Sequence, residues 1–397
     1  MVTRRDFVRT VGVGAAGALG TSWIGARGRE DSVWSILEPG LQAAELQGAV
    51  IPLSSNENPM GASQAVLDAI TRAFGPSGAT PGRYSSATTE LRDVLAKSLG
   101  VLPGNIALGC GSTQILRTAT HVFTARDKAL VGTIPTYEEC AGYADMLGHP
   151  VRPVSLNRDF RMDLDQMVDA SRGAGLVFYC NPNNPVATYV GASETKNFIA
   201  RVHKESPETT ILVDEAYFEY VTHPDHETMI PLAIADPRVV VARTFSKAYG
   251  IAGLRLGYAV GHPDALRKMN NWDSASGTSS LNVLALHAGI AAINQGPAFI
   301  DAERARNKAA RDFTIKWFAD RGMKSTESHT NFIFTNIGVP ARGFRDGCAK
   351  QGVRVGRDFP PFEQGWCRIS IGTMEEMTRA VAVFGDVLGK KGVVTAA

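Results

Sequence analysis

The sequence has few cysteines, almost no net charge and no long apolar run. Its five cysteines, at positions 110, 140, 180, 348 and 367, include no Cys-x-x-Cys pair, so neither a disulfide scaffold nor a cysteine-rich zinc site is expected. Lys plus Arg number 41 and Asp plus Glu 39, so the net charge is +2 and no basic surface for nucleic acid is expected. No uninterrupted stretch of about 18 apolar residues predicts a transmembrane helix.

The chain is long enough for more than one hydrophobic core. Of its 397 residues, 44% are hydrophobic and 20% are charged, which is ordinary for a globular protein and unlike a disordered or collagen-like chain. A single core rarely serves so long a chain, so two domains are expected.

The first 28 residues differ from the rest in composition. Arg4 and Arg5 precede a weakly apolar stretch rich in Gly and Ala, at 10–26, which is the layout of an export signal. The pattern from Thr3 to Val8 resembles a twin-arginine signal, which directs the export of folded proteins. A disordered basic tail is the alternative. We therefore expect a periplasmic or otherwise exported protein that meets the membrane only transiently, or a cytoplasmic one if the leader does not function.

Residues 100–260 alternate between short apolar runs and helical stretches. Runs such as Ile211-Leu212-Val213 are apolar at consecutive positions, as expected for strands covered on both faces. This pattern predicts an α/β fold with a large, doubly wound and mostly parallel sheet. The expected strands are 128–131, 151–156, 176–180, 211–213, 239–243 and 256–260.

The sequence changes character after Asp273. A helical pattern runs from Leu281 to Arg321, where Gly322 is placed to end it, and strands are expected at 331–335 and 368–371. These elements predict a smaller α+β domain. The expected divisions are a signal at 1–28, an N-terminal segment that packs with the small domain at 29–75, a large domain at 76–280 and a small domain at 281–397.

Two clusters predict turns at the carboxyl ends of strands, where α/β folds bind ligands. The first, from Gly109 to Gln114, has glycines and hydroxyls before a helix, and free amides at a helix start attract anions. An ordinary helix N-cap is the alternative. The second, from Asn181 to Pro185, is either a rigid turn that presents amide groups or simply a tight turn.

Two further clusters place charged side chains at strand ends. Asp214 follows the strand at 211–213, where a carboxylate needs a cation or solvent. A Mg²⁺ ligand, an acid–base group and the partner of a protonated heterocycle all remain open for it. Lys247 lies among hydroxyls, with Arg255 eight residues later, which suits an amine beside an anionic group. A solvated lysine is the alternative.

In this order the four clusters resemble the class I/II aminotransferases of fold type I, which depend on pyridoxal 5′-phosphate (PLP). The similarity is greatest to histidinol-phosphate aminotransferases and extends over most of the chain beyond the leader. Further matches are Asn56-Glu57-Asn58-Pro59, Pro135-Thr136-Tyr137 and Arg368-Ile369-Ser370-Ile371-Gly372-Thr373. The resemblance implies a large PLP-binding domain, a smaller C-terminal domain and a homodimer with shared active sites.

The resemblance assigns catalysis to Lys247, Asp214 and Tyr217. Lys247 would hold PLP as a Schiff base and then act as general base and acid. Asp214 would keep the pyridine nitrogen protonated. Asn184 and Tyr217 would donate to the phenolic oxygen of the ring, and Tyr137 would stack on the ring.

The resemblance also assigns the residues that bind anions. Arg368 would bind the substrate carboxylate with its planar fork, and Asn331 would also bind substrate. Tyr84 would reach the PLP phosphate of the neighbouring subunit. The remaining phosphate ligands would be Ser112, Thr113, Thr244, Ser246 and Arg255.

One turn departs from the family pattern. Where the family has Asn-Pro-Thr-Gly, this chain has Asn184-Pro185-Val186-Ala187, which should change the substrate pocket while PLP still binds. The expected reaction moves an amino group between an L-amino acid, histidinol-phosphate-like or aromatic or other, and a 2-oxo acid such as 2-oxoglutarate. A PLP-dependent decarboxylase or racemase is the first alternative, and a binding protein without turnover is the second. No metal site is expected.

Overall fold

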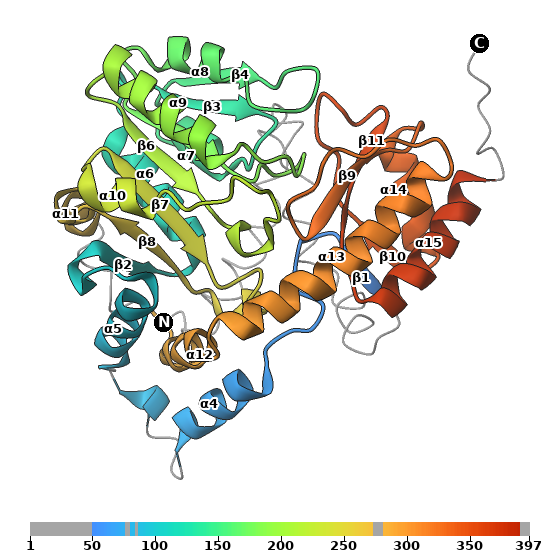
Figure 1. Ribbon diagram of the computed structural model, residues 1–397, viewed down its shortest axis with the longest axis horizontal. Coiled ribbons are helices and arrows are strands. Elements are labelled where there is room, and N and C mark those ends of the chain that lie inside the picture. The colour runs from blue at the N-terminus through green and yellow to red at the C-terminus, as the bar shows by residue number, and fades with distance from the viewer. Residues whose placement is uncertain (1–49, 76–79, 84–85, 273–280, 390–397) are drawn as a thin grey trace, which may run out of the picture. The chain divides into compact units, whose positions relative to one another are not determined.

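The computed structural model describes residues 50–75, 80–83, 86–272 and 281–389. Its main feature is a seven-stranded sheet (Figure 1). In β8, the chain runs antiparallel to both neighbouring strands, and the other neighbours pair in parallel. This topology confirms the predicted α/β class. In spatial order the strands are β2 (Ile106–Gly109), β8 (Gly257–Gly261), β7 (Val239–Thr244), β6 (Thr210–Asp214), β5 (Leu176–Cys180), β3 (Leu130–Ile134) and β4 (Val151–Ser155).

Both faces of the central strands β5, β6, β7 and β8 are buried, and successive side chains on these strands enter different cores. Val239 and Val241 of β7 belong to one core, whereas Val240 and Ala242 belong to the other. The helices of the first core are α4 (Gln64–Phe74), α5 (Ala87–Leu99), α8 (Leu164–Ser171), α9 (Ala192–Glu205), α10 (Ile230–Ala235) and α12 (Val283–Asn294). Those of the second are α6 (Gly111–Phe123), α7 (Glu139–Met146) and α11 (Pro263–Trp272).

The register of the central strands brings the predicted site residues to one edge. Cys180 of β5 pairs with Asp214 of β6, and Asp214 pairs with Ala242 of β7. Parallel strands place their carboxyl ends at the same edge of a sheet. The turn at 181–185, Asp214 and the loop that carries Lys247 therefore emerge side by side.

The helical pattern from Leu281 to Arg321 forms two helices and not one continuous helix. These are α12 and α13 (Pro297–Ala319), with a bend of 87° between them. Gly296 has a φ of 72°, which glycine adopts at little cost, and Pro297 can begin a helix but not continue one. Within the described ranges no single helix is long and apolar enough to cross a membrane, although this bent pair passes that test by length and composition.

A second group of elements forms a smaller α+β core. β1 (Ile51–Leu53) pairs in parallel with β10 (Val353–Val355), and β9 (Phe332–Asn336) pairs antiparallel with β11 (Trp366–Ser370). Phe318 of α13 is buried there against α14 (Ala341–Lys350) and α15 (Met374–Leu388). The long helix α13 also contacts the short turn of helix at Phe218–Tyr220 near the large sheet, so it links the two groups (Figure 1).

The segment before residue 76 divides between the two cores. β1 pairs with β10 of the smaller core, whereas α4 packs on α12 and contributes Val66 to the larger core. Ala285 and Leu286 of α12 also lie in the larger core, although the sequence places this helix in the small domain. The boundaries expected at residues 76 and 281 stay predictions, and the expected signal at 1–28 lies outside the described residues.

Candidate active site

Lys247 lies in the loop that follows β7, at the carboxyl edge of the sheet. Its Nζ donates to the carbonyl of Ser55 at 3.2 Å and lies 5.7 Å from the centre of the Tyr217 ring. Burial lowers the pKa of Lys247 to about 8, and the positive charges of Arg368 and Arg255 act in the same direction. Half of these amines are therefore neutral, and nucleophilic, at about pH 8.

Asp214 ends β6 as a buried carboxylate with 3% of its surface exposed. Its Oδ2 accepts a weak hydrogen bond from Cys180 Sγ at 3.9 Å, whereas Oδ1 has no partner among the described residues. Burial raises the pKa of Asp214 to about 7. An unpaired buried carboxylate oxygen is costly, so this position suits a ligand that supplies a positively charged N–H.

Arg368 projects from β11 and connects the smaller core to the site. Its Nη1 donates to Asn184 Oδ1 at 2.8 Å, and its Nη2 donates to the carbonyl of Ser54 at 2.5 Å. Nε is buried and has no partner among the residues that the structure describes, and the guanidinium carbon lies 4.8 Å from the centre of the Phe359 ring. Burial lowers the pKa of Arg368 to about 10, which leaves it cationic at neutral pH. It pairs with no carboxylate in the described part of the chain, so it can bind an anion.

The start of α6 and Arg255 form a second site for an anion. Ser112 and Thr113 lie in the first turn of α6, where backbone amides lack helical acceptors. Arg255 lies against this turn, because a Cβ added to Gly111 would be 2.4 Å from Arg255 Nη2. Arg255 Nη1 also donates to Ser246 Oγ at 3.4 Å. Helix amides, a hydroxyl and a guanidinium together suit a phosphate.

Two other residues keep this phosphate site in place. A Cβ added to Gly257 of β8 would be 2.4 Å from the amide nitrogen of Ser112, so only glycine lets β8 pass this close to α6. Thr244, predicted as a phosphate ligand, is buried, and its Oγ1 accepts from the amide of Ser246 at 3.1 Å. In this structure Thr244 therefore orients the loop that leads to Lys247.

Two tyrosines lie beside these groups. Tyr137 is half-buried and hydrogen-bonds with Thr113, and burial raises the pKa of its hydroxyl. Tyr217 is buried with its ring edge to face against Phe332, 5.1 Å between ring centres. Its hydroxyl accepts from Asn56 Nδ2 at 3.1 Å, and burial raises its pKa as well. Both tyrosines are therefore neutral at neutral pH and can donate hydrogen bonds.

Residues 54–58, called the strap below, cross the site and were missed as site residues by sequence reasoning. The strap follows β1, and it contacts Lys247, Arg368 and Tyr217 through the three bonds described above. Asn331, predicted to bind substrate, is fully buried and donates to the carbonyl of Asn56 at 2.9 Å. It thereby holds the strap, and its role toward substrate stays a prediction. The motif Asn56-Glu57-Asn58-Pro59 marked this segment in the sequence without indicating its contacts.

The turn that departs from the family pattern is buried near Arg368. Val186 is fully buried in a cluster with Phe334 and Phe359, and Phe359 faces the guanidinium of Arg368. Ala187 has a φ of 65°, a left-handed conformation that is uncommon for a residue with a Cβ. The predicted effect of this turn on the substrate pocket stays a prediction. Tyr84, the remaining predicted ligand, lies outside the described residues.

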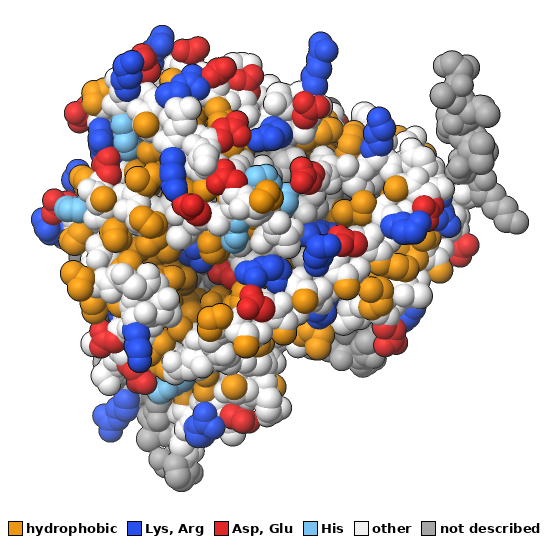
Figure 2. Space-filling view, viewed as in Figure 1, with side chains coloured by type: hydrophobic (Ala, Val, Ile, Leu, Met, Phe, Trp, Pro, Cys, Tyr) orange, Lys and Arg blue, Asp and Glu red, His pale blue; other side chains and the backbone are white. Residues whose placement is uncertain are grey.

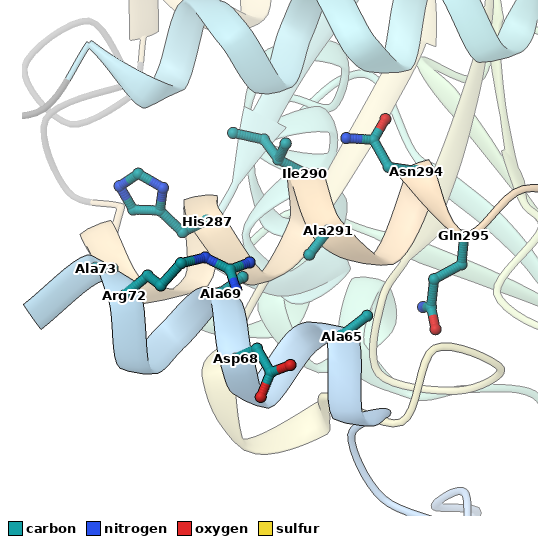
Figure 3. A pocket seen from close by; sticks show the side chains of 10 residues that line it. All are labelled: Ala65, Asp68, Ala69, Arg72, Ala73, His287, Ile290, Ala291, Asn294 and Gln295. Atoms are coloured by element: carbon teal, nitrogen blue, oxygen red, sulfur yellow. The ribbon is translucent and has the colours of Figure 1, made fainter.

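A groove between α4 and α12 is separate from this site (Figure 3). Its lining includes Asp68 and Arg72 of α4 with His287 and Asn294 of α12, and none of the predicted site residues. On the face shown in Figure 2, acidic and basic side chains are interspersed, in keeping with the net charge of +2.

A family model and individual relatives each match this chain over most of its length. The family described as aminotransferase class I and II matches residues 49–384. The chain is 34% identical over 365 residues to histidinol-phosphate aminotransferase 2 of Methylococcus capsulatus, which covers 88% of this chain and 95% of the relative. It is 32% identical over 348 residues to the histidinol-phosphate aminotransferase of Halalkalibacterium halodurans, covering 86% and 90%.

Solved structures resemble this one over nearly their whole length. The histidinol-phosphate aminotransferase of Sinorhizobium meliloti, solved in complex with PLP, has a TM-score of 0.79 at 26% identity, covering 92% of this chain and 99% of that one. The aspartate aminotransferase of Thermotoga maritima has a TM-score of 0.77 at 20% identity, covering 89% and 96%, and supports the fold alone.

The cofactor is PLP, and the described residues fit it. PLP carries a phosphate, a pyridine nitrogen and an aldehyde. The site offers the α6 phosphate site, the unpartnered Oδ1 of Asp214 and the amine of Lys247. The unpartnered carboxylate oxygen is the sharpest test of this fit, because a protonated pyridine nitrogen supplies the donor that it lacks. The individual ligand assignments stay predictions.

The lowered pKa of Lys247 predicts how fast the apoenzyme captures PLP at each pH. Below this pKa the ammonium cannot attack the aldehyde, so the rate should rise with pH to a midpoint near 8, well below the 10.5 of an ordinary lysine. Removing a neighbouring positive charge with Arg368→Met should move the midpoint to higher pH, because that charge disfavours the ammonium. The visible absorbance of lysine-bound PLP measures the rate.

The matched control is Arg342→Met, which removes an exposed arginine on α14 that pairs with Asp358. It should leave the midpoint of PLP capture unchanged. A wild-type midpoint near that of an ordinary lysine, or equal midpoints in both arginine variants, would contradict this account of Lys247.

Proposed function

Because the chain belongs to the class I and II aminotransferase family, we propose that its amine donor is histidinol phosphate or an aromatic amino acid and that a 2-oxo acid such as 2-oxoglutarate accepts the amino group. The reaction is a PLP-dependent transamination. The names of the relatives support a donor like histidinol phosphate.

This proposal rests on the observation that Arg368 has no carboxylate partner among the described residues. Its guanidinium is buried beside Lys247, pairs with no carboxylate in the described ranges and keeps an unpartnered Nε. Each proposed donor carries an anion close to its amine-bearing carbon, a carboxylate or a phosphate ester. The rings of Phe359 and Phe332 flank the guanidinium at 4.8 and 5.7 Å, so the anion meets its cation in an apolar setting that strengthens the attraction.

The side chains of this chain divide the work of the reaction. When bound, PLP accepts the electrons released at the amine-bearing carbon. Asp214 holds the proton on the pyridine nitrogen, and Asn184 and Tyr217 donate to the phenolic oxygen. Lys247 Nζ, whose pKa is lowered to about 8, takes the proton from the amine-bearing carbon of the donor. Ser112, Thr113, Ser246 and Arg255 hold the phosphate, and Tyr137 covers the ring.

The test is a panel of amine donors assayed with 2-oxoglutarate, with glutamate formation as the measurement. Histidinol phosphate or an aromatic amino acid should give the highest kcat/KM, and Lys247→Ala should abolish turnover. Arg368→Lys should lower kcat/KM for the donor, which corresponds to a loss of about 1.5–3 kcal/mol in transition-state binding. The reason is that a point charge cannot reproduce the bidentate hydrogen bonds of a guanidinium.

Arg342→Lys, at an exposed position in the first turn of α14, is the control and should leave kcat/KM unchanged. Carbon dioxide release without a 2-oxo acid would indicate the decarboxylase alternative, and inversion of the donor without glutamate would indicate the racemase. An Arg368→Lys variant with wild-type kcat/KM would mean that another group binds the anion.

We also propose a homodimer in which Tyr84 of the partner subunit contacts the phosphate of PLP. This follows from the resemblance of Gly82-Arg83-Tyr84 to the family. Tyr84→Ala should weaken PLP binding by about 1.5–3 kcal/mol, and Lys247→Ala should be inactive. In a mixed dimer one site carries both changes and the other carries neither, so subunit exchange at limiting PLP should restore roughly a quarter of wild-type activity. No recovery despite proven exchange would place Tyr84 in its own subunit's site or in none.

We further propose that residues 1–28 export the folded, PLP-loaded protein. The paired arginines and the Gly- and Ala-rich stretch at 10–26 support this, because a cofactor made in the cytoplasm must be bound before transport. Replacing Arg4 and Arg5 together by lysine should retain active enzyme in the cytoplasm, measured by cell fractionation. A wild-type protein that is wholly cytoplasmic would contradict an export function.

A further inference from the structure

Asn56 occupies an unusual position in the strap. It is 1% exposed, and its φ of 56° lies in the left-handed region, which Asn and Asp tolerate better than other residues with a Cβ. Its carbonyl accepts from Asn331 Nδ2 at 2.9 Å, which holds the backbone of Asn56 in place. What its side-chain amide contacts is therefore determined by the fold.

Asn56 and Ser370 of β11 bond to each other in both directions. The amide nitrogen of Asn56 donates to Ser370 Oγ at 2.8 Å, and Ser370 Oγ donates to Asn56 Oδ1 at 2.9 Å. A backbone N–H can only donate, so Ser370 must accept there, and its single proton is directed to the side-chain oxygen of Asn56. This pair fixes which end of the Asn56 amide faces Ser370.

The other end of the amide, Nδ2, faces the hydroxyl of Tyr217 at 3.1 Å. An NH₂ group can only donate, so Tyr217 accepts from it and must direct its own proton elsewhere. Burial raises the pKa of Tyr217 and keeps that proton in place. Among its neighbours, Arg368 lowers the pKa whereas Cys180 and Asp214 raise it. Tyr217 is therefore a neutral donor, and the hydrogen bond that it accepts from Asn56 prevents its own proton from pointing toward Asn56.

The same strand orients the second donor of the site. Arg368 precedes Ser370 by two residues on β11, so the two side chains share a face. Arg368 Nη1 donates to Asn184 Oδ1 at 2.8 Å, which leaves Nδ2 as the donating end of that amide. One strand of the smaller core thus sets the polarity of both Asn184 and Tyr217.

We propose that Asn56, held by Ser370, is a positioning residue that turns the hydroxyl proton of Tyr217 toward the phenolic oxygen of PLP. This rests on the role proposed above for Tyr217. A donor at that oxygen stabilises its negative charge, which lowers the pKa of the PLP–lysine linkage. The pH-dependent visible absorbance of the holoenzyme measures that pKa independently of turnover.

The decisive substitution is Asn56→Asp, which keeps the shape and the left-handed backbone but removes the NH₂ donor. Tyr217 should then donate to the new carboxylate and not to PLP, so the linkage pKa should rise by about one pH unit. A negative charge would raise this pKa by itself, so the same substitution is also made in Tyr217→Phe. In that background the part of the shift that depends on the Tyr217 hydroxyl should disappear.

Asn58→Asp is the matched control for charge. Asn58 is in the same strap and buried, but its Nδ2 donates to the carbonyl of Ala248 and not to Tyr217. Its effect on the linkage pKa should be smaller and equal in the Tyr217 and Phe backgrounds. Ser370→Ala should raise the pKa in the same direction as Asn56→Asp, and Ser370→Thr should restore it. The Ser370 pair carries the test if Asn56→Asp does not fold.

Equal shifts from Asn56→Asp in both backgrounds would show an effect of charge alone and overturn the proposal. The proposal would also be overturned if Ser370→Ala and Asn56→Asp both kept the wild-type linkage pKa while Tyr217→Phe changed it. That result would leave the role of Tyr217 intact. If Tyr217→Phe itself has a wild-type linkage pKa, the proposed role of Tyr217 fails, and the positioning role fails with it. Transamination is measured on the same variants, so that these pKa outcomes can be told apart from a failure of the proposed donor specificity.

Discussion

The site depends on three cations, Lys247, Arg368 and Arg255. Burial and the two arginines lower the pKa of Lys247, whereas Glu57 and the buried Asp214 raise it. Like charges repel and burial removes their solvation, so this arrangement costs free energy until an anionic ligand occupies it. The phosphate of PLP and the anion of the proposed donor would relieve that cost at two different points. Burial first, and then the positive charges of Arg368 and Arg255, lower the pKa of Lys247 into the range where it can act.

Holding these charges in place requires contacts between the two cores. Arg368 belongs to a strand of the smaller core but bonds to Asn184, which follows a strand of the large sheet. The strap adds a second set of bonds, since residues 54–58 reach Lys247, Arg368 and Tyr217. The site is thus completed by bonds that span 161 to 314 positions of the sequence, and the pairing of Ile51 in β1 with Val353 in β10 is similarly long-range.

Hydrogen-bond polarity is a second requirement of the same site. A tyrosine hydroxyl and a side-chain amide can each either donate or accept, and only donation stabilises a negative oxygen. Arg368 and Ser370, two residues apart on β11, present donors that settle this choice for Asn184 directly and for Tyr217 through Asn56. The smaller core therefore contributes the direction of bonds as well as a binding residue.

Local sequence patterns determined the α/β class and the predicted places of Asp214 and Lys247, although the strand expected at 128–131 is β3, Leu130–Ile134. Consecutive apolar runs and glycine-rich turns act over a few residues, so they are readable without tertiary contacts. The break at Gly296 was missed because helical periodicity continues on both sides of it. Only the tertiary structure brought the strap over Lys247 and joined Ser370, Asn56 and Tyr217. Those contacts depend on strand register and on long-range packing, which no local pattern encodes.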